Sequence, residues 1–316
     1  MNKITNNLKF TMNKLTLFLV CMVLYLATIP TIYAYADGTK LIETQNGTMN
    51  TRQIGESGVS VVFETGYGDA LIYEENQDTW NGIQDAAGKY AKTIAYDRFG
   101  LGKSSDICNI PSLTNKQRQI IIDGGSIKYN QNSLNGQYKT ARDKAINLHD
   151  LLSKAKIKKP YVLVVHSVGS FTAIEFAKMY KADLAGIIML EGTFPALNKE
   201  LYKWEKDNRP ELAEHYADEF SDADGNVDEI LIGGLQCEKD LKSLNNIPIL
   251  YLQASDTEMG NKQVDELWEK GIINMISNSK FSKKVVVPNS THYVHRCNPE
   301  FVNDQIKAFI DKINIK

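Results

Sequence analysis

The chain has 316 residues, of which 43% are hydrophobic and 23% are charged, and its net charge is −2. This composition supports a full hydrophobic core and excludes a disordered or collagen-like chain. The first 36 residues hold three of the 36 basic residues and none of the 38 acidic ones, so the remainder has a charge of −5. A mildly acidic body without clustered Lys and Arg argues against nucleic acid as a partner.

Residues 1–36 are typical of a targeting segment. The basic stretch MNKITNNLKFTMNK precedes an uncharged run, and Ala34-Tyr35-Ala36 places small residues where a signal peptidase cuts. We therefore predict a signal peptide and a secreted or extracytoplasmic protein. The alternative is an uncleaved membrane anchor at residues 15–36, which is long enough to span a bilayer. This segment is the only membrane contact that we expect.

Three cysteines follow the targeting segment, at Cys108, Cys237 and Cys297. Export would place them in an oxidising compartment, where an odd number allows at most one bridge within the chain. A bridge between Cys237 and Cys297 and free buried thiols are both open alternatives. The cysteine spacing does not match a zinc site.

Strand and helix patterns alternate along the rest of the chain. A hairpin is expected first, with Asn46-Gly47 as its turn. Helical patterns follow at 141–155 and 299–313. Short apolar runs rich in β-branched residues predict six strands, at 59–63, 93–96, 161–165, 186–190, 247–252 and 283–288. This alternation predicts the α/β class, with a mostly parallel sheet covered by helices on both faces.

Two stretches interrupt this alternation. Residues 105–137 are polar and rich in Asn and Gly, and we expect a long surface loop there. Residues 193–245 contain helical patches without a strand pattern, and we expect a mainly helical cap insertion. The α/β core is then formed by residues 37–192 and 246–316.

The chain passes directly from a strand to a helix at Val165-His166-Ser167-Val168-Gly169. A serine in such a turn projects its hydroxyl from the carboxyl edge of the sheet and leaves the next N–H pointing at a developing oxyanion. The pattern therefore predicts a nucleophile elbow with Ser167 at its tip. A helix N-cap serine is the alternative. Val165 replaces the first glycine of G-x-S-x-G, and we expect it to crowd the turn.

A serine nucleophile requires a histidine base later in the chain. His292 follows the last predicted strand, in the stretch NSTHYVH, and is the predicted base. His295 is the competing candidate for the base, but we expect it to pack or form hydrogen bonds near the helix start. We expect His166 to be structural, and His149 on a helix and His215 in the cap to be surface or interface residues. No histidines stand with acids at metal-ligand spacing, so no metal is expected.

The acid that orients the base is expected after the strand that precedes the histidine strand. Asp256, in the stretch ASDTEMG, has this place, and Glu258 and Glu191 remain open alternatives. The oxyanion hole is expected to use the backbone N–H groups of Tyr67, in ETGYGD at 64–69, and of Val168.

Four motifs occur in a fixed order: ETGYGD, YDRFGLGKS at 96–104, VHSVGS and NSTHYVH. From about residue 58 onward the chain resembles the α/β-hydrolase superfamily. The resemblance implies an α/β-hydrolase fold, a triad of Ser167, Asp256 and His292, and no cofactor. It also implies a structural role for the turn at 96–100. Val165 and Ser170 depart from glycines that are frequent in the family.

These features predict a serine hydrolase that cleaves an ester of a small molecule, in the manner of a carboxylesterase or lipase, through an acyl-enzyme. One alternative is an aminopeptidase-like hydrolase of amide substrates, in which Glu211, Glu214 or Asp218 holds the substrate ammonium. The other is a ligand-binding or signalling protein of low turnover, because fold does not fix function. The acidic stretch at 222–229 lacks the EF-hand glycine and glutamate, and we expect an exposed turn.

Overall fold

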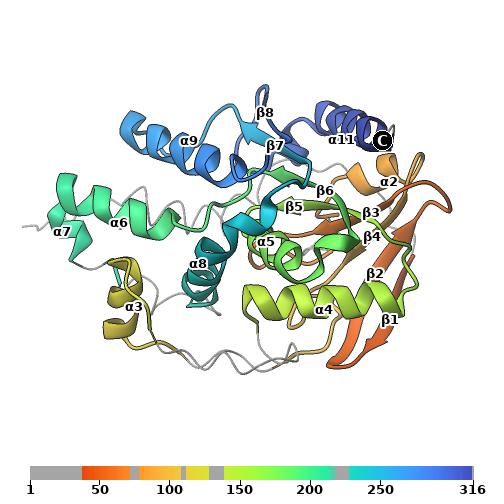
Figure 1. Ribbon diagram of the computed structural model, residues 1–316, viewed down its shortest axis with the longest axis horizontal. Coiled ribbons are helices and arrows are strands. Elements are labelled where there is room, and N and C mark those ends of the chain that lie inside the picture. Colours follow the sequence, from red (N-terminus) through yellow and green to blue (C-terminus); the bar gives the residue numbers. More distant parts are fainter. Residues whose placement is uncertain are drawn as a thin grey trace, which may run out of the picture.

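The computed structural model describes residues 38–71, 78–107, 112–127, 139–214, 216–217 and 228–314. The targeting segment predicted at residues 1–36 lies outside them. The described part forms an eight-stranded sheet in the order β1-β2-β4-β3-β5-β6-β7-β8 (Figure 1). The strands are β1 (Thr39–Thr44), β2 (Gly47–Ile54), β3 (Ser60–Glu64), β4 (Lys92–Tyr96), β5 (Tyr161–His166), β6 (Leu184–Leu190), β7 (Ile249–Ala254) and β8 (Ser282–Val287).

Pairing from β4 to β8 is parallel, whereas β2 pairs antiparallel with both β1 and β4. The six strands that the β-branched runs predict are therefore confirmed. Parallel strands end at one common edge, so the residues that follow β3, β5, β6, β7 and β8 meet there. This edge brings the motifs of the sequence together.

Helices cover both faces of the sheet (Figure 1). On one face, α2, α10 and α11 enclose an apolar cluster that includes Trp80, Val164 and Ile306; on the other, α4, α5, α8 and α9 enclose a larger one with Leu148, Phe176 and Trp268. The helices are α2 (Ile83–Ala87), α3 (Asn115–Ile122), α4 (Ala141–Lys154), α5 (Gly169–Tyr180), α6 (Leu197–Asn208), α7 (Pro210–Ala213), α8 (Asp228–Asp240), α9 (Lys262–Ile276), α10 (Val294–Cys297) and α11 (Pro299–Asn314), with 3-10 turns at Lys181–Asp183 and Leu241–Leu244.

The N-terminal hairpin is confirmed, but its turn was predicted one residue too late. Thr44 pairs with Gly47, so the turn residues are Gln45 and Asn46. The Gln45 N–H donates to Asp150 Oδ2 at 2.8 Å, which holds the turn against α4. Gly47 begins β2 with a φ of 140°, which favours glycine, and a Cβ there would lie only 3.0 Å from the Cβ of Ser105.

The long loop predicted at 105–137 is wrong for its middle part, which forms α3. Thr114 begins this helix with a capping box, because its Oγ1 accepts the Gln117 N–H at 3.3 Å and the Gln117 side chain accepts the Thr114 N–H at 2.9 Å. The buried Arg118 then forms an ion pair with Asp228 at the start of α8, at 2.8 Å. These contacts attach α3 to the segment between β6 and β7.

The segment predicted as a cap, 193–245, contains two different parts. In Figure 1, α6 and α7 lie beside α3 and away from the strands, whereas α8 lies alongside α5. On α8, the Cys237 thiol donates to the Phe171 carbonyl at 3.4 Å, and a Cβ on Gly233 would lie 3.0 Å from the Phe171 ring. The second part of the insertion therefore packs on the α/β layers themselves.

Of the three cysteines that follow the targeting segment, the structure describes two, and both are free thiols. Cys237 is buried and Cys297 is exposed, so the bridge between them, one of the two alternatives, is absent. Burial raises the pKa of the Cys237 thiol well above its usual value. Cys108 lies outside the described residues. Within the described part of the chain, no helix is both long and apolar enough to span a bilayer.

Candidate active site

Ser167 lies at the tip of the turn between β5 and α5. Its φ of 52° is in the left-handed region, and only 1% of its surface is exposed. The Ser167 N–H donates to the Leu190 carbonyl at 3.2 Å, and its own carbonyl accepts the Thr193 N–H at 3.0 Å. The ends of β5 and β6 thus hold the serine in a sharply turned backbone, which is the geometry expected of a nucleophile elbow.

The crowding expected at Val165 does not occur. Val165 is fully buried and pairs regularly with Glu64 of β3 and Met189 of β6. The glycine that the turn needs is Gly169, where a Cβ would lie 2.8 Å from the Thr65 carbonyl oxygen. Ser170 fits at the second departure from the family pattern, because its Oγ donates to the Thr193 carbonyl at 2.6 Å.

The predicted oxyanion loop lies against the serine. A Cβ on Gly66 would lie 3.2 Å from the Cβ of Ser167, so the glycine allows the loop to approach the elbow. Val168 is the N-cap residue of α5, and no described residue accepts its N–H. The structure therefore brings the loop that contains Gly66 next to Ser167 and Val168.

The predicted base also reaches this edge. The His292 ring lies 4.8 Å, centroid to centroid, from the ring of His166, the residue before Ser167. No described residue, His292 included, forms a hydrogen bond with Ser167 Oγ. The structure thus places His292 in the neighbourhood of the serine, without the direct hydrogen bond that proton transfer requires.

Two serines that the sequence analysis missed connect the loops of the predicted acid and base. Ser255 accepts the Ser290 N–H at 2.9 Å through its Oγ, and Ser290 Oγ accepts the Ser255 N–H at 3.2 Å. The Asp256 N–H also donates to the Ser290 carbonyl, at 3.0 Å. These reciprocal bonds hold the loop after β7 against the loop after β8, two residues before His292.

Each of the three candidate acids accepts a hydrogen bond from a backbone N–H. Asp256 is exposed, and its Oδ1 accepts the N–H of Glu258 at 2.8 Å. The Glu258 carboxylate accepts the backbone N–H of His292 at 3.4 Å. Glu191 turns toward β7, where it accepts the Ala254 N–H at 2.5 Å, and burial raises its pKa to about 7.

His166 contacts the backbone of the predicted base. Its Nε2 lies 3.1 Å from the His292 carbonyl oxygen, and since a carbonyl only accepts, this nitrogen carries hydrogen. Its Nδ1 lies 3.7 Å from Oδ2 of the buried Asp69. Both contacts support the structural role expected of His166. Asp69 was missed because nothing in its local sequence indicates a contact with a residue almost a hundred positions away.

Burial favours the neutral imidazoles of His292 and His295. The pKa of His292 is well below 6.5 because of desolvation, with a smaller contribution from His166. The pKa of His295 is also well below its usual value, for the same main reason. A neutral imidazole at neutral pH is the form that accepts a proton from a serine.

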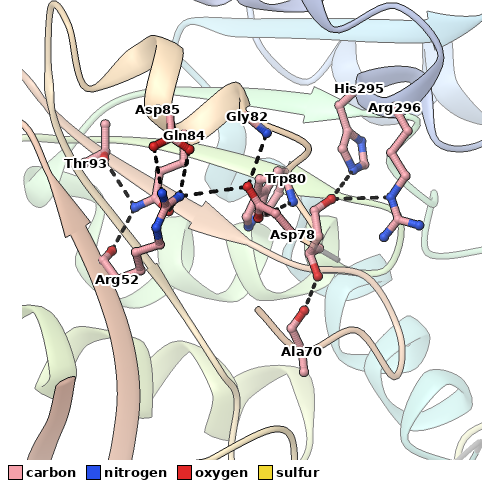
Figure 2. A network of polar contacts seen from close by, with 11 residues as sticks. Arg52, Ala70, Asp78, Trp80, Gly82, Gln84, Asp85, Thr93, His295 and Arg296 are labelled. Carbon is pink, nitrogen blue, oxygen red and sulfur yellow. Dashed lines mark hydrogen bonds and ion pairs between the residues drawn. The ribbon is translucent and has the colours of Figure 1, made fainter. Parts of the chain in front are cut away.

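His295 anchors α10 to the turn before α2, as Figure 2 shows. Its Nε2 lies 3.2 Å from the Thr79 carbonyl oxygen, which Arg296 also contacts through Nε at 3.4 Å. In the same network, Asp78 accepts the Trp80 N–H at 3.0 Å, and burial raises the Asp78 pKa. This agrees with the packing and hydrogen-bonding role expected of His295, and it fixes the helix that follows His292.

The remaining predicted residues lie elsewhere or outside the description. His149 pairs with Asp183 at 2.9 Å and stacks on Tyr180 of α5 at 3.8 Å between ring centroids, as expected for a helix residue away from the site. Glu211 and Glu214 are exposed on or beside α7, whereas His215, Asp218 and most of 222–229 lie outside the described residues. Within the described residues, no group of three or more His, Cys, Asp or Glu side chains has the arrangement of a metal site.

No family model matches the chain. YqjL of Bacillus subtilis (strain 168), described as an uncharacterized protein, is 25% identical over 256 residues, which cover 79% of this chain and 82% of YqjL. A thermophilic esterase from Thermogutta terrifontis is similar in structure, with a TM-score of 0.55 and 18% identity over 87% of this chain and 98% of the esterase. An epoxide hydrolase from Vigna radiata has a TM-score of 0.57 and 13% identity, over 88% of this chain and 100% of the hydrolase.

The strand order, the two helical layers and these similarities agree. The protein has the α/β-hydrolase fold, which confirms the fold class implied by the four sequence motifs.

Proposed function

We propose that this protein is an exported serine hydrolase that cleaves an ester of a small molecule. The observation that carries the proposal is the backbone conformation of Ser167 together with the absence of a hydrogen bond to its hydroxyl from the described residues. This serine is held at positive φ at the carboxyl edge of a parallel sheet, between a glycine loop and a helix N-terminus. Its hydroxyl forms no hydrogen bond with a described residue, so it is not used as a helix cap. The structural similarity to an esterase agrees with this chemistry.

In the proposed reaction, Ser167 Oγ attacks the ester carbonyl carbon and its proton passes to His292. The N–H groups of Tyr67 and Val168 stabilise the oxyanion that forms. His292 then gives its proton to the leaving alkoxide, and the acyl group stays on Ser167. A water molecule that loses a proton to His292 then attacks the acyl carbon. The bond from this carbon to Ser167 Oγ breaks, His292 returns the proton to Oγ, and the carboxylic acid leaves. Direct proton transfer requires a movement that closes the distance between His292 and Ser167.

Asp256 is the proposed orienting acid. Support comes from its place after β7 and from its backbone bond to Ser290 in the histidine loop. Glu258 is the competing candidate, since its carboxylate already contacts the His292 backbone. Glu191 is the weaker candidate because its carboxylate is bonded to the backbone of β7.

The test is hydrolysis of p-nitrophenyl esters of increasing acyl length by the mature protein. Ser167→Ala is expected to lower kcat by several orders of magnitude, because nucleophile and base act as a unit. Ser153→Ala, which removes an exposed hydroxyl on α4, is the matched control and should retain full activity. Equal activity of wild type and Ser167→Ala would exclude Ser167 as the nucleophile. Preferential cleavage of aminoacyl p-nitroanilides would favour an aminopeptidase instead.

Export is tested separately by N-terminal sequencing of the protein recovered from outside the cytoplasm. Cleavage after Ala36 gives a chain that begins at Asp37. A chain that retains residues 15–36 and stays with the membrane fraction would indicate an anchor.

A further inference from the structure

Arg98 contacts the oxyanion loop directly. It lies in the turn after β4, and only 5% of its surface is exposed. Its Nη2 donates to the Gly66 carbonyl oxygen. A second donor, the Asp69 N–H, lies 3.5 Å from the same oxygen. The sequence motif containing Arg98 was expected to be structural only, and nothing in the sequence predicts this contact across 32 positions.

The Gly66 carbonyl and the Tyr67 N–H belong to one peptide unit. This unit is not among the cis peptides of the described chain, and in a planar trans peptide the C=O and the N–H point in opposite directions. Holding the carbonyl therefore determines where the N–H points. A guanidinium on the carbonyl also polarises the peptide, which makes its N–H a stronger donor.

Glu64 holds Arg98 in place from the other side. Its Oε1 lies 3.6 Å from Arg98 Nη1 and accepts the Thr172 hydroxyl of α5 at 2.8 Å, while Oε2 accepts the Tyr96 hydroxyl. A Cβ on Gly169 would lie 3.0 Å from the Glu64 Cγ. One fully buried carboxylate thus contacts both the arginine and the helix that begins at the elbow.

We propose that Arg98 is a positioning residue for the oxyanion hole, acting through the Gly66–Tyr67 peptide, with Glu64 as its anchor. This inference rests on the proposed serine-hydrolase function. Arg98 itself does not touch the substrate. It fixes the Tyr67 N–H relative to the Val168 N–H, and so its contribution is realised when negative charge develops on the carbonyl oxygen.

The test compares Arg98→Met and Arg98→Lys with wild type in ester hydrolysis and in inhibition by an alkyl trifluoromethyl ketone. Such a ketone reacts with the serine to form an oxyanion resembling that of the reaction. Losing an oxyanion donor costs about 10²- to 10³-fold in kcat, so its misorientation in Arg98→Met is expected to cost about 10- to 100-fold. KM should stay within about twofold, and the ketone Ki should rise by the same factor as kcat falls. Arg98→Lys keeps the charge without the planar fork and should fall between the two.

Arg142→Met is the matched control. Arg142 also pairs with a fully buried glutamate, Glu175, at 3.0 Å, but this pair joins α4 and α5 away from the oxyanion loop. Loss of the Arg142–Glu175 ion pair is expected to change the free energy of unfolding and to leave kcat and the ketone Ki unchanged.

Unchanged kcat and Ki in folded Arg98→Met would overturn the proposal, as would equal losses in Arg142→Met. If Arg98→Met does not fold, unchanged kcat and Ki in Arg98→Lys would overturn it. Failure of the underlying function gives a different result, because the wild type itself would then neither hydrolyse esters nor bind the ketone.

Discussion

Left-handed backbone is concentrated at the carboxyl edge of the sheet. Four non-glycine residues with positive φ follow four successive parallel strands: Ser167, Glu191, Glu258 and Asn289, with φ between 44° and 60°. Such a conformation costs about 1–2 kcal/mol per residue in an L-amino acid. Strain of this kind gathers at functional sites, where the surrounding structure holds it in place.

At Ser167 this strain predicts a stability difference between two inactive variants. Ser167→Gly relieves the left-handed conformation, whereas Ser167→Ala keeps it. We therefore expect Ser167→Gly to unfold at higher urea concentration, with a gain of about 1 kcal/mol over Ser167→Ala. Equal unfolding free energies would show that the turn carries no strain.

The buried histidine predicts the acid limb of the pH profile. His292 must be neutral to act as a base, and burial lowers its pKa well below 6.5. The value of kcat/KM for an uncharged ester should therefore hold as the pH falls through 6.5 and decline only in more acidic buffer. A decline centred at or above pH 6.5 would contradict this environment.

The same pKa shift has a defined sign for stability. Between the folded-state pKa of His292 and pH 6.5, the unfolded chain protonates this histidine while the folded protein does not. The contribution of neutral His292 to the free energy of unfolding is thus fully present above pH 6.5, and it is lost as the pH falls toward the folded-state pKa.

The triad acid is assigned by three isosteric substitutions. Asp256→Asn is expected to lower kcat by about 10³- to 10⁴-fold, because the imidazole loses the partner that orients it. Glu258→Gln and Glu191→Gln should each lower kcat by less than about tenfold. A larger loss of kcat in Glu258→Gln than in Asp256→Asn would instead assign the role of triad acid to Glu258, whose carboxylate contacts the His292 backbone.

Among the elements, α3 shows how a short helix is stabilised by its ends. Thr114 and Gln117 complete the capping box at its start, and Arg118 binds Asp228 through Nε at 2.8 Å and Nη2 at 3.1 Å. Asp228 also accepts the Leu113 N–H at 2.8 Å. The helix is therefore fixed to α8 at both its cap and its buried face.

Removing the cap tests this account. Thr114→Ala leaves the Gln117 N–H without its acceptor and should lower the unfolding free energy by about 1 kcal/mol. Lys116→Ala, an exposed position in the same first turn, is the control and should change it by less than about 0.5 kcal/mol. Equal effects of both substitutions in urea unfolding would remove the capping box from the stability of α3.

At the scale of the whole molecule, the sequence predicted what depends on local pattern. The runs VSVVF and YVLVV are β-branched and bounded by turn residues, and they form central strands buried on both faces. The order of the motifs predicted that Ser167, His292 and Asp256 follow strands ending at one edge, which the strand order confirms. Their roles in a triad stay a prediction.

Two different causes explain what the sequence analysis missed. At α3 the local signature T-x-x-Q was present at Thr114, but the polar composition around it favoured a loop. The other misses are contacts between distant segments. The contact of Arg98 with Gly66 and that of Asp69 with His166 join different strand ends, and no local periodicity records them. The hairpin turn was shifted because Gly47, whose φ is 140°, is the first residue of β2 rather than a turn residue.

The central claim is that Ser167 is an activated nucleophile, and covalent labelling tests it most directly. The native protein is treated with a fluorophosphonate, and the modified peptide is identified by mass spectrometry. We predict one adduct, on Ser167, that is lost in Ser167→Ala and strongly slowed in His292→Ala, where the base is absent. An unlabelled wild-type protein, or an adduct on another serine, would contradict the account.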